Sequence, residues 1–172
     1  KILVQLTTSH HHSMCFDIFF TEKDKQSPYE IIKSYNLVPD NVIKLLDLKS
    51  PDDIFSEILK QSTSVIAVLG SAVPSHSNYD RKAKAKFLSK GGDPKQFTYK
   101  YPYSIGSLEK LEKDVKGWGS ISFLDQLDGI MRSLPLIVQF DKKLYTTMGR
   151  EMIRGGEKQT HIDVEWKEVV IE

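Results

Sequence analysis

Two short apolar runs, with helix start signals between them, set the class of fold that this chain can adopt. Residues 14–20 are rich in aromatic and β-branched side chains, and residues 65–69 are apolar throughout and are followed by Gly70. Runs of this length and composition predict strands, and the first predicts a strand buried on both faces, as in a parallel sheet. Neither run approaches the roughly 20 apolar residues of a membrane-spanning helix.

The two helix start signals share a serine at the capping position and a proline at the first helical position. They are Ser27-Pro28-Tyr29-Glu30 and Ser50-Pro51-Asp52-Asp53. They predict one helix that ends near residue 36 and a second whose apolar residues share one face. Residues 42–46 predict a further short helix between them. A strand, helices and a second strand are the start of an α/β unit.

A hairpin is expected in the second half of the chain. Residues 121–124 and 130–140 predict two strands, and the five residues between them end in Asp128-Gly129. Asp-Gly suits the positive φ angles of a tight turn, so the two strands are expected to pair antiparallel. Before them, Ser107 can cap a helix that ends at Gly117.

Two last elements complete the expected fold. A helix is predicted near residues 147–154, and alternating apolar and charged residues predict a strand over 162–166. Residues 1–172 are therefore expected to form one α/β domain, since 172 residues do not comfortably fit two. Its architecture would be an α/β sandwich: a mixed β-sheet with helices on its faces, the parallel part first and the antiparallel hairpin later.

Residues 71–106 carry the weakest pattern and are expected to form a long loop region, of the kind that is usually functional or partly mobile. They contain a basic run at 81–90 and an alternating aromatic row at 97–103. The aromatic row fits either a surface that stacks on bases or sugars or an edge strand, to which Pro102 is suited. The basic run fits plain exposure to solvent or contact with anionic lipid head groups.

The charge balance argues against a polyanion binder. The chain has 24 Lys and Arg residues against 23 Asp and Glu residues, whereas nucleic-acid binders usually show a clear basic excess. With 40% hydrophobic and 27% charged residues, it is typical of a soluble globular fold. Cys15 is the single cysteine, which excludes an internal disulfide. Inside an expected buried strand, its thiol should be an inert apolar group.

Three acidic residues stand where a ligand can meet the sheet. Asp17 interrupts the first apolar run, and Asp125 and Asp128 bracket the expected hairpin turn. Ligands of open α/β sheets lie outside the carboxyl ends of the strands, where such acids can bind Mg²⁺ or Ca²⁺. The simpler interpretation is structural, with Asp17 paired to a cation such as Arg132 because a buried carboxylate needs compensation.

The order of these segments resembles a family of bacterial sensor domains. Residues 16–22, 52–59 and 65–69 are similar to the first strand, the following acid-started helix and the second strand of the type-two CHASE domains. These are the cyclase/histidine-kinase-associated sensory extracellular domains. The most specific match is the block Asp-Gly-x-x-Arg-x-x-Pro-Leu at 128–136, whereas residues 27–50 look like an insertion relative to the family.

The resemblance implies a ligand-sensing domain on the extracytoplasmic (periplasmic) face of the bacterial cell membrane, held between transmembrane helices that this chain does not contain. The output half of the parent protein would be an adenylate or guanylate cyclase, a diguanylate cyclase or a kinase. The ligand would be a small molecule or an ion that biases one conformation, and the parent would form a homodimer. The resemblance implies neither a nucleic-acid partner nor a cofactor, metal or catalytic residue. Asp17, Asp128 and Arg132 are expected to form a polar cluster that shapes the fold or the pocket.

Two other functions stay open at this point. A metal-dependent phosphohydrolase would use Asp17, Asp125 and Asp128 to turn over a phosphomonoester with Mg²⁺. A protein-interaction module would instead have a large exposed apolar face and no well-formed polar pocket.

Overall fold

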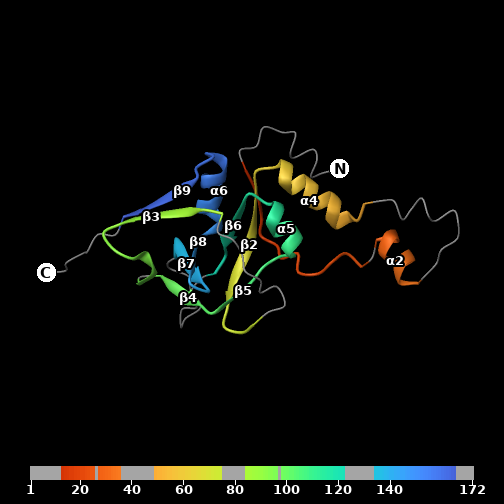
Figure 1. The fold of residues 1–172 in the computed structure, drawn as a ribbon, viewed down its shortest axis with the longest axis horizontal. Helices are drawn as coiled ribbons and strands as arrows, with labels where there is room; N and C mark the ends of the chain where they lie inside the picture. The colour runs from red at the N-terminus through yellow and green to blue at the C-terminus, as the bar shows by residue number, and fades with distance from the viewer. Residues whose placement is uncertain are drawn as a thin grey trace.

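The computed structural model describes residues 13–25, 27–35, 49–74, 84–96, 98–122 and 134–165 (Figure 1). The strands are β1 (Met14–Phe16), β2 (Ser64–Ser71), β3 (Lys86–Lys90), β4 (Tyr99–Tyr101), β5 (Tyr103–Ile105), β6 (Gly117–Ser120), β7 (Ile137–Phe140), β8 (Lys143–Thr146) and β9 (His161–Glu165). The helices are α2 (Pro28–Ser34), α4 (Pro51–Gln61), α5 (Glu109–Asp114) and α6 (Met148–Gly156), with a 3₁₀ turn, η1 (Pro94–Gln96).

Strand β2 is the centre of the fold. It pairs in parallel with β1 through residues 64–66 and with β6 through residues 65–68. Further along it pairs antiparallel with β5 through residues 69–71. The first five residues of β2 are fully buried, and the strand expected over 65–69 lies within β2. In chain order, the antiparallel partner β5 comes before the parallel partner β6.

Two smaller sheets complete the β structure. In one, β7 lies between β4, which is parallel to it, and β8, which is antiparallel. In the other, β3 and β9 form a parallel pair. With helices packed against these sheets, the α/β fold class with a mixed sheet is confirmed.

The hydrophobic core lies where the central sheet meets β7 and β8. Its buried members are Ile66, Val68, Val115, Trp118, Val138, Phe140 and Tyr145. The ring of Tyr145 lies 4.9 Å from that of Phe140 and 6.2 Å from that of Trp118, measured between centroids. Aromatic contacts at these distances stabilise a core beyond the area that they bury.

Helix α6 packs directly on β6 because two glycines leave room for it. A Cβ at Gly119 would lie 2.3 Å from the Cα of Met148, and one at Gly117 would lie 2.4 Å from Oε1 of Glu151. Side chains alternate along a strand, so Trp118 points to the opposite face and enters the core. In Figure 1, α6 lies on one side of β2, and α4 and α5 lie on the other.

The helix start signals predicted two helices correctly. The N–H of Glu30 donates to Oγ of Ser27 at 3.3 Å, which caps α2. At α4 the side chain of Ser50 makes no such bond, and its carbonyl instead accepts from the N–H groups of Asp53 and Ile54. The helix expected over 42–46 lies outside the described residues.

The first apolar run behaves differently from the prediction. Strand β1 ends at Phe16, and Cys15 is exposed within it. A strand buried on both faces was therefore the wrong expectation, and so was an inert, buried thiol. The physical reason is that the chain leaves the sheet after Phe16 and packs its aromatic residues on α4, where the ring centroids of Phe16 and Phe20 lie 5.8 and 5.0 Å from that of Phe55.

The expected hairpin between 121–124 and 130–140 is also wrong in its described part. Ile121 and Ser122 are not in a strand, and both edges of β7 are occupied by β4 and β8. An antiparallel hairpin forms one step later, between β7 and β8, around Asp141 and Lys142, which both have positive φ angles. The turn expected at 125–129 lies outside the described residues.

The region 71–106 is not a simple loop, because its described part contains β3, β4, β5 and η1. Strand β4 lies at the edge of its sheet, and Pro102 separates it from β5, so the edge-strand interpretation of the aromatic row is confirmed. Tyr101 covers Gly70, where a Cβ would lie 2.3 Å from its ring. The pairing partner of β3 comes much later in the chain, and no local pattern marked this strand.

Candidate functional site

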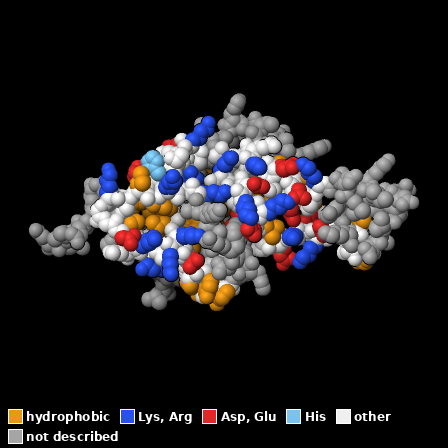
Figure 2. Space-filling model, in the orientation of Figure 1, with side chains coloured by type: hydrophobic (Ala, Val, Ile, Leu, Met, Phe, Trp, Pro, Cys, Tyr) orange, Lys and Arg blue, Asp and Glu red, His pale blue; other side chains and the backbone are white. Residues whose placement is uncertain are grey.

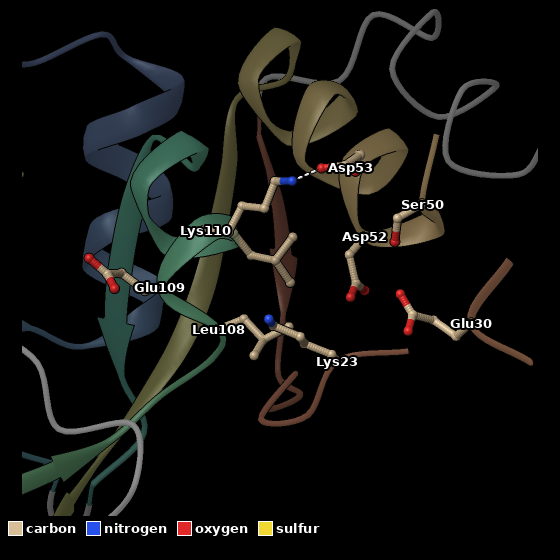
Figure 3. A pocket seen from close by; sticks show the side chains of 9 residues that line it. Lys23, Glu30, Ser50, Asp52, Asp53, Leu108, Glu109 and Lys110 are labelled. Carbon is tan, nitrogen blue, oxygen red and sulfur yellow. Dashed lines mark ion pairs between the residues drawn. The ribbon is translucent and has the colours of Figure 1, made fainter. Parts of the chain in front are cut away.

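A pocket of about 470 Å³ lies beside the first turns of α4 and α5 (Figure 3). Both helices lead into parallel strands of the central sheet, α4 into β2 and α5 into β6. The lining residues are Lys23, Glu30, Ser50, Asp52, Asp53, Leu108, Glu109, Lys110 and Leu111.

Three hydrogen bonds hold the loop after β1 against the two helices. The N–H of Leu108 donates to the carbonyl of Phe20 at 2.8 Å, and the N–H of Phe20 donates to Oγ of Ser107 at 3.1 Å. The N–H of Asp24 donates to Oδ2 of Asp52 at 3.1 Å. The loop that carries Lys23 is thus fastened at both ends of the pocket.

Some of the charges around the pocket neutralise one another. Lys110 forms an ion pair with Asp53, which joins α5 to α4. Glu109 forms an ion pair with Lys113 at 2.7 Å, and Figure 3 shows its carboxylate pointing away from the other acids of the pocket. These four side chains therefore form two ion pairs.

The remaining charges face the cavity without an ionic partner. In Figure 3 the carboxylates of Asp52 and Glu30 point toward one another from α4 and α2, and the side chain of Lys23 extends toward Leu108. Within the described part of the chain, Lys23 and Glu30 form no ion pair, and Asp52 accepts only the backbone N–H described above. On the surface over α4 and α5, acidic and basic side chains lie close together (Figure 2).

Of the polar cluster expected from the sequence, the structure describes only Asp17. Asp17 is exposed directly after β1 and does not line this pocket. Asp125, Asp128 and Arg132 lie outside the described residues, so the cluster stays a prediction. Among the residues that the structure does describe, no three His, Cys, Asp or Glu side chains are grouped so that they could hold a metal ion.

Four of the pocket residues belong to the two helix start signals: Glu30, Ser50, Asp52 and Asp53. Those signals predict where the helices begin, but they do not predict that the helix starts face one cavity, because this depends on how distant segments pack. Nothing in the local sequence marks Lys23 as a pocket residue.

A second polar group, buried under α6, is structural. Arg154 donates through Nε to Oε2 of Glu151 at 2.9 Å and through Nη2 to Oε1 at 2.5 Å. Arg154 also donates to the carbonyl of Gln159 at 2.8 Å and to the carbonyl of Lys116 at 3.3 Å. Oγ1 of Thr146 donates to Oε2 of Glu151 at 3.2 Å. This network fastens α6 to the residues around it.

The described lysines of the basic run at 81–90 differ in their surroundings. Lys84 turns inward, where its Nζ donates to the carbonyl of Lys113 at 2.8 Å and lies 5.3 Å from the ring centroid of Trp118. Burial lowers the pKa of the Lys84 ammonium, and the negative charge of Asp114 partly offsets this effect. Lys86 and Lys90, in contrast, are exposed on β3.

Comparisons with protein-family models, with curated proteins and with solved structures found no match for this chain. Within the described residues, none of the helices combines the length and the apolar character that crossing a membrane requires.

Proposed function

We propose that this chain is the extracytoplasmic ligand-sensing domain of a membrane-bound bacterial signal-transduction protein, whose output half is a nucleotide cyclase or a sensor kinase. The observation that carries the proposal is the pocket beside α4 and α5. It is lined by three separate parts of the chain: the segment from Lys23 to Glu30, the first turn of α4, and the first turn of α5. A ligand there would contact all three parts at once.

The sequence gives independent support. The Asp-Gly-x-x-Arg-x-x-Pro-Leu block at 128–136 resembles the type-two CHASE domains, whose role is sensory. The segment 52–59, which that resemblance aligns with the helix after the first strand, lies in α4 and begins with a pocket residue. Among the pocket residues, Asp52 and Asp53 lie in a segment that is similar to the family, whereas Glu30 and Ser50 lie in the insertion at 27–50.

The mechanism would be a population shift. A ligand that binds one arrangement of α2, α4 and α5 more tightly than another raises the population of the first. A tenfold difference in affinity corresponds to about 1.4 kcal/mol, which is enough to change the output of a parent whose two states are nearly balanced. The domain itself would need no catalytic group.

The experiment uses the full-length parent protein. We expect the parent to have apolar segments outside residues 1 and 172 and to be recovered in the membrane fraction. We also expect its output activity to change when Asp52→Asn alters the pocket. The matched control is Glu57→Gln, because Glu57 is also on α4 but pairs with Lys49 away from the pocket. A soluble parent without an output domain would refute the proposal.

The same preparation tests the phosphohydrolase hypothesis. If the chain turned over a generic phosphomonoester with Mg²⁺, and if Asp17→Asn abolished this turnover without unfolding the protein, the enzyme would replace the sensor as the better explanation. We expect no such turnover.

A further inference from the structure

We infer that the pocket beside α4 and α5 binds a small zwitterion of the amino-acid type, with a second cationic group favoured. This inference rests on the proposed function, because it names the class of ligand that the sensor pocket would take. Its basis is a cavity that combines unpaired charges of both signs with an apolar wall, rather than the presence of acidic residues alone.

The charge count is the first step. After the ion pairs of Lys110 with Asp53 and of Glu109 with Lys113 are set aside, Asp52, Glu30 and Lys23 remain. These supply two negative charges and one positive charge. A ligand with two cationic groups and one carboxylate would satisfy all three, whereas a simple anion would repel the carboxylates and a neutral sugar would offer them hydroxyl donors without a compensating charge.

The arrangement is the second step. Asp52 and Glu30 approach the cavity from two different helices, and their carboxylates point toward one another in Figure 3, so two cationic groups of one ligand could each face one of them. Lys23 comes from the loop and extends toward Leu108, which places positive charge beside the apolar wall formed by Leu108 and Leu111. An α-carboxylate near Lys23 would therefore leave an aliphatic side chain against the leucines.

The size of the cavity is the third step. About 470 Å³ lies within the range of roughly 300–1,000 Å³ that small-molecule sites occupy. An amino acid with its hydration water fits this volume, whereas a nucleotide would find no basic cluster for its phosphates among the lining residues.

The test is calorimetric titration of the 172-residue chain with three related probes. L-lysine carries both ammonium groups and the carboxylate, L-norleucine lacks the second ammonium, and 1,5-diaminopentane lacks the carboxylate. We expect L-lysine to bind most tightly and each of the other two to bind about tenfold more weakly, because each loses one charge-assisted contact in a partly exposed site.

Variants assign each contact to a residue. Lys23→Gln should weaken L-lysine and L-norleucine about tenfold and leave 1,5-diaminopentane unchanged, because only the first two probes have a carboxylate. Asp52→Asn should weaken all three probes, and its amide oxygen can still accept the N–H of Asp24, so the loop stays in place. The control is Lys25→Gln in the same loop, since Lys25 pairs with Glu22 and does not line the pocket.

The outcomes separate this inference from the function on which it rests. Equal affinities for the three probes, no binding of any of them, or a Lys23→Gln effect on the diamine as large as that on L-lysine would overturn the inference. A membrane-bound parent whose output responded to some other ligand would then still support the sensor function. Conversely, the expected binding pattern would uphold the inference even if the parent were soluble and had no output domain, and such a parent would refute the sensor function.

Discussion

The buried ion pair between Arg154 and Glu151 should contribute strongly to the stability of the fold. The Arg154 side chain is 9% exposed and that of Glu151 is 2% exposed. Arg154→Met keeps most of the aliphatic volume but leaves the Glu151 carboxylate and the carbonyls of Gln159 and Lys116 without their shared donor. Removing one partner of a buried pair costs about 3–5 kcal/mol, because an uncompensated charge stays in the interior.

The assay is urea unfolding followed by far-ultraviolet circular dichroism, with the free energy of unfolding from linear extrapolation. We expect Arg154→Met to lower the free energy of unfolding by about 3–5 kcal/mol. In thermal unfolding, this corresponds to a midpoint temperature lower by roughly 10 °C for a chain of this size. The double variant with Glu151→Leu should be more stable than Arg154→Met alone, since it removes the stranded carboxylate.

The matched control is Arg150→Met, one turn earlier on α6. Arg150 makes only an exposed 3.4 Å hydrogen bond to the side chain of Gln159, so its replacement should change the free energy of unfolding by less than about 0.5 kcal/mol. If Arg154→Met cost no more than Arg150→Met, the claim that this pair fastens α6 to the sheet would be refuted.

Further expectations concern glycines and one lysine. Gly119→Ala should destabilise the protein by about 1–3 kcal/mol in urea unfolding, since its Cβ would meet the backbone of Met148. Gly149→Ala should stabilise the protein by up to about 1 kcal/mol, because the space around its Cβ in α6 is open. The opposite order would contradict the close packing of α6 on β6. Burial lowers the pKa of Lys84 below 10.5, so the folded state releases this proton more readily than the unfolded state. Stability measured relative to Lys84→Met should therefore rise with pH between the lowered pKa and 10.5, and a flat difference across that window would contradict the assignment.

The parts of the fold that the sequence predicted are those with local causes. The cap of α2 by Ser27 and the burial of β2 follow from residues within a few positions of each other. The stop of α6 near Gly155 and Gly156 is of the same kind. Such features need no knowledge of distant segments, which is why they could be read from the sequence.

The missed features depend on partners far along the chain. β3 pairs with β9 and β4 pairs with β7, and the alternating aromatic row indicated an edge strand near β4 without indicating its partner. The Gly117-Trp118-Gly119 segment lacks the third glycine of a dinucleotide fingerprint, and only the approach of α6 shows why both glycines are there. The pocket also depends on distant partners, because Lys23 lines it only when the N–H of Leu108 binds the carbonyl of Phe20 in the loop after β1.

The same contacts suggest how an event in the pocket would reach the far side of the sheet. The pocket wall at Leu108 and Leu111 belongs to α5 and the residue before it, and α5 is only six residues long. Its Glu112 carbonyl accepts the indole N–H of Trp118 at 3.1 Å, and the carbonyl of Lys116, just after the helix, accepts from Arg154. A shift of α5 would therefore act on the core through Trp118 and on α6 through Arg154.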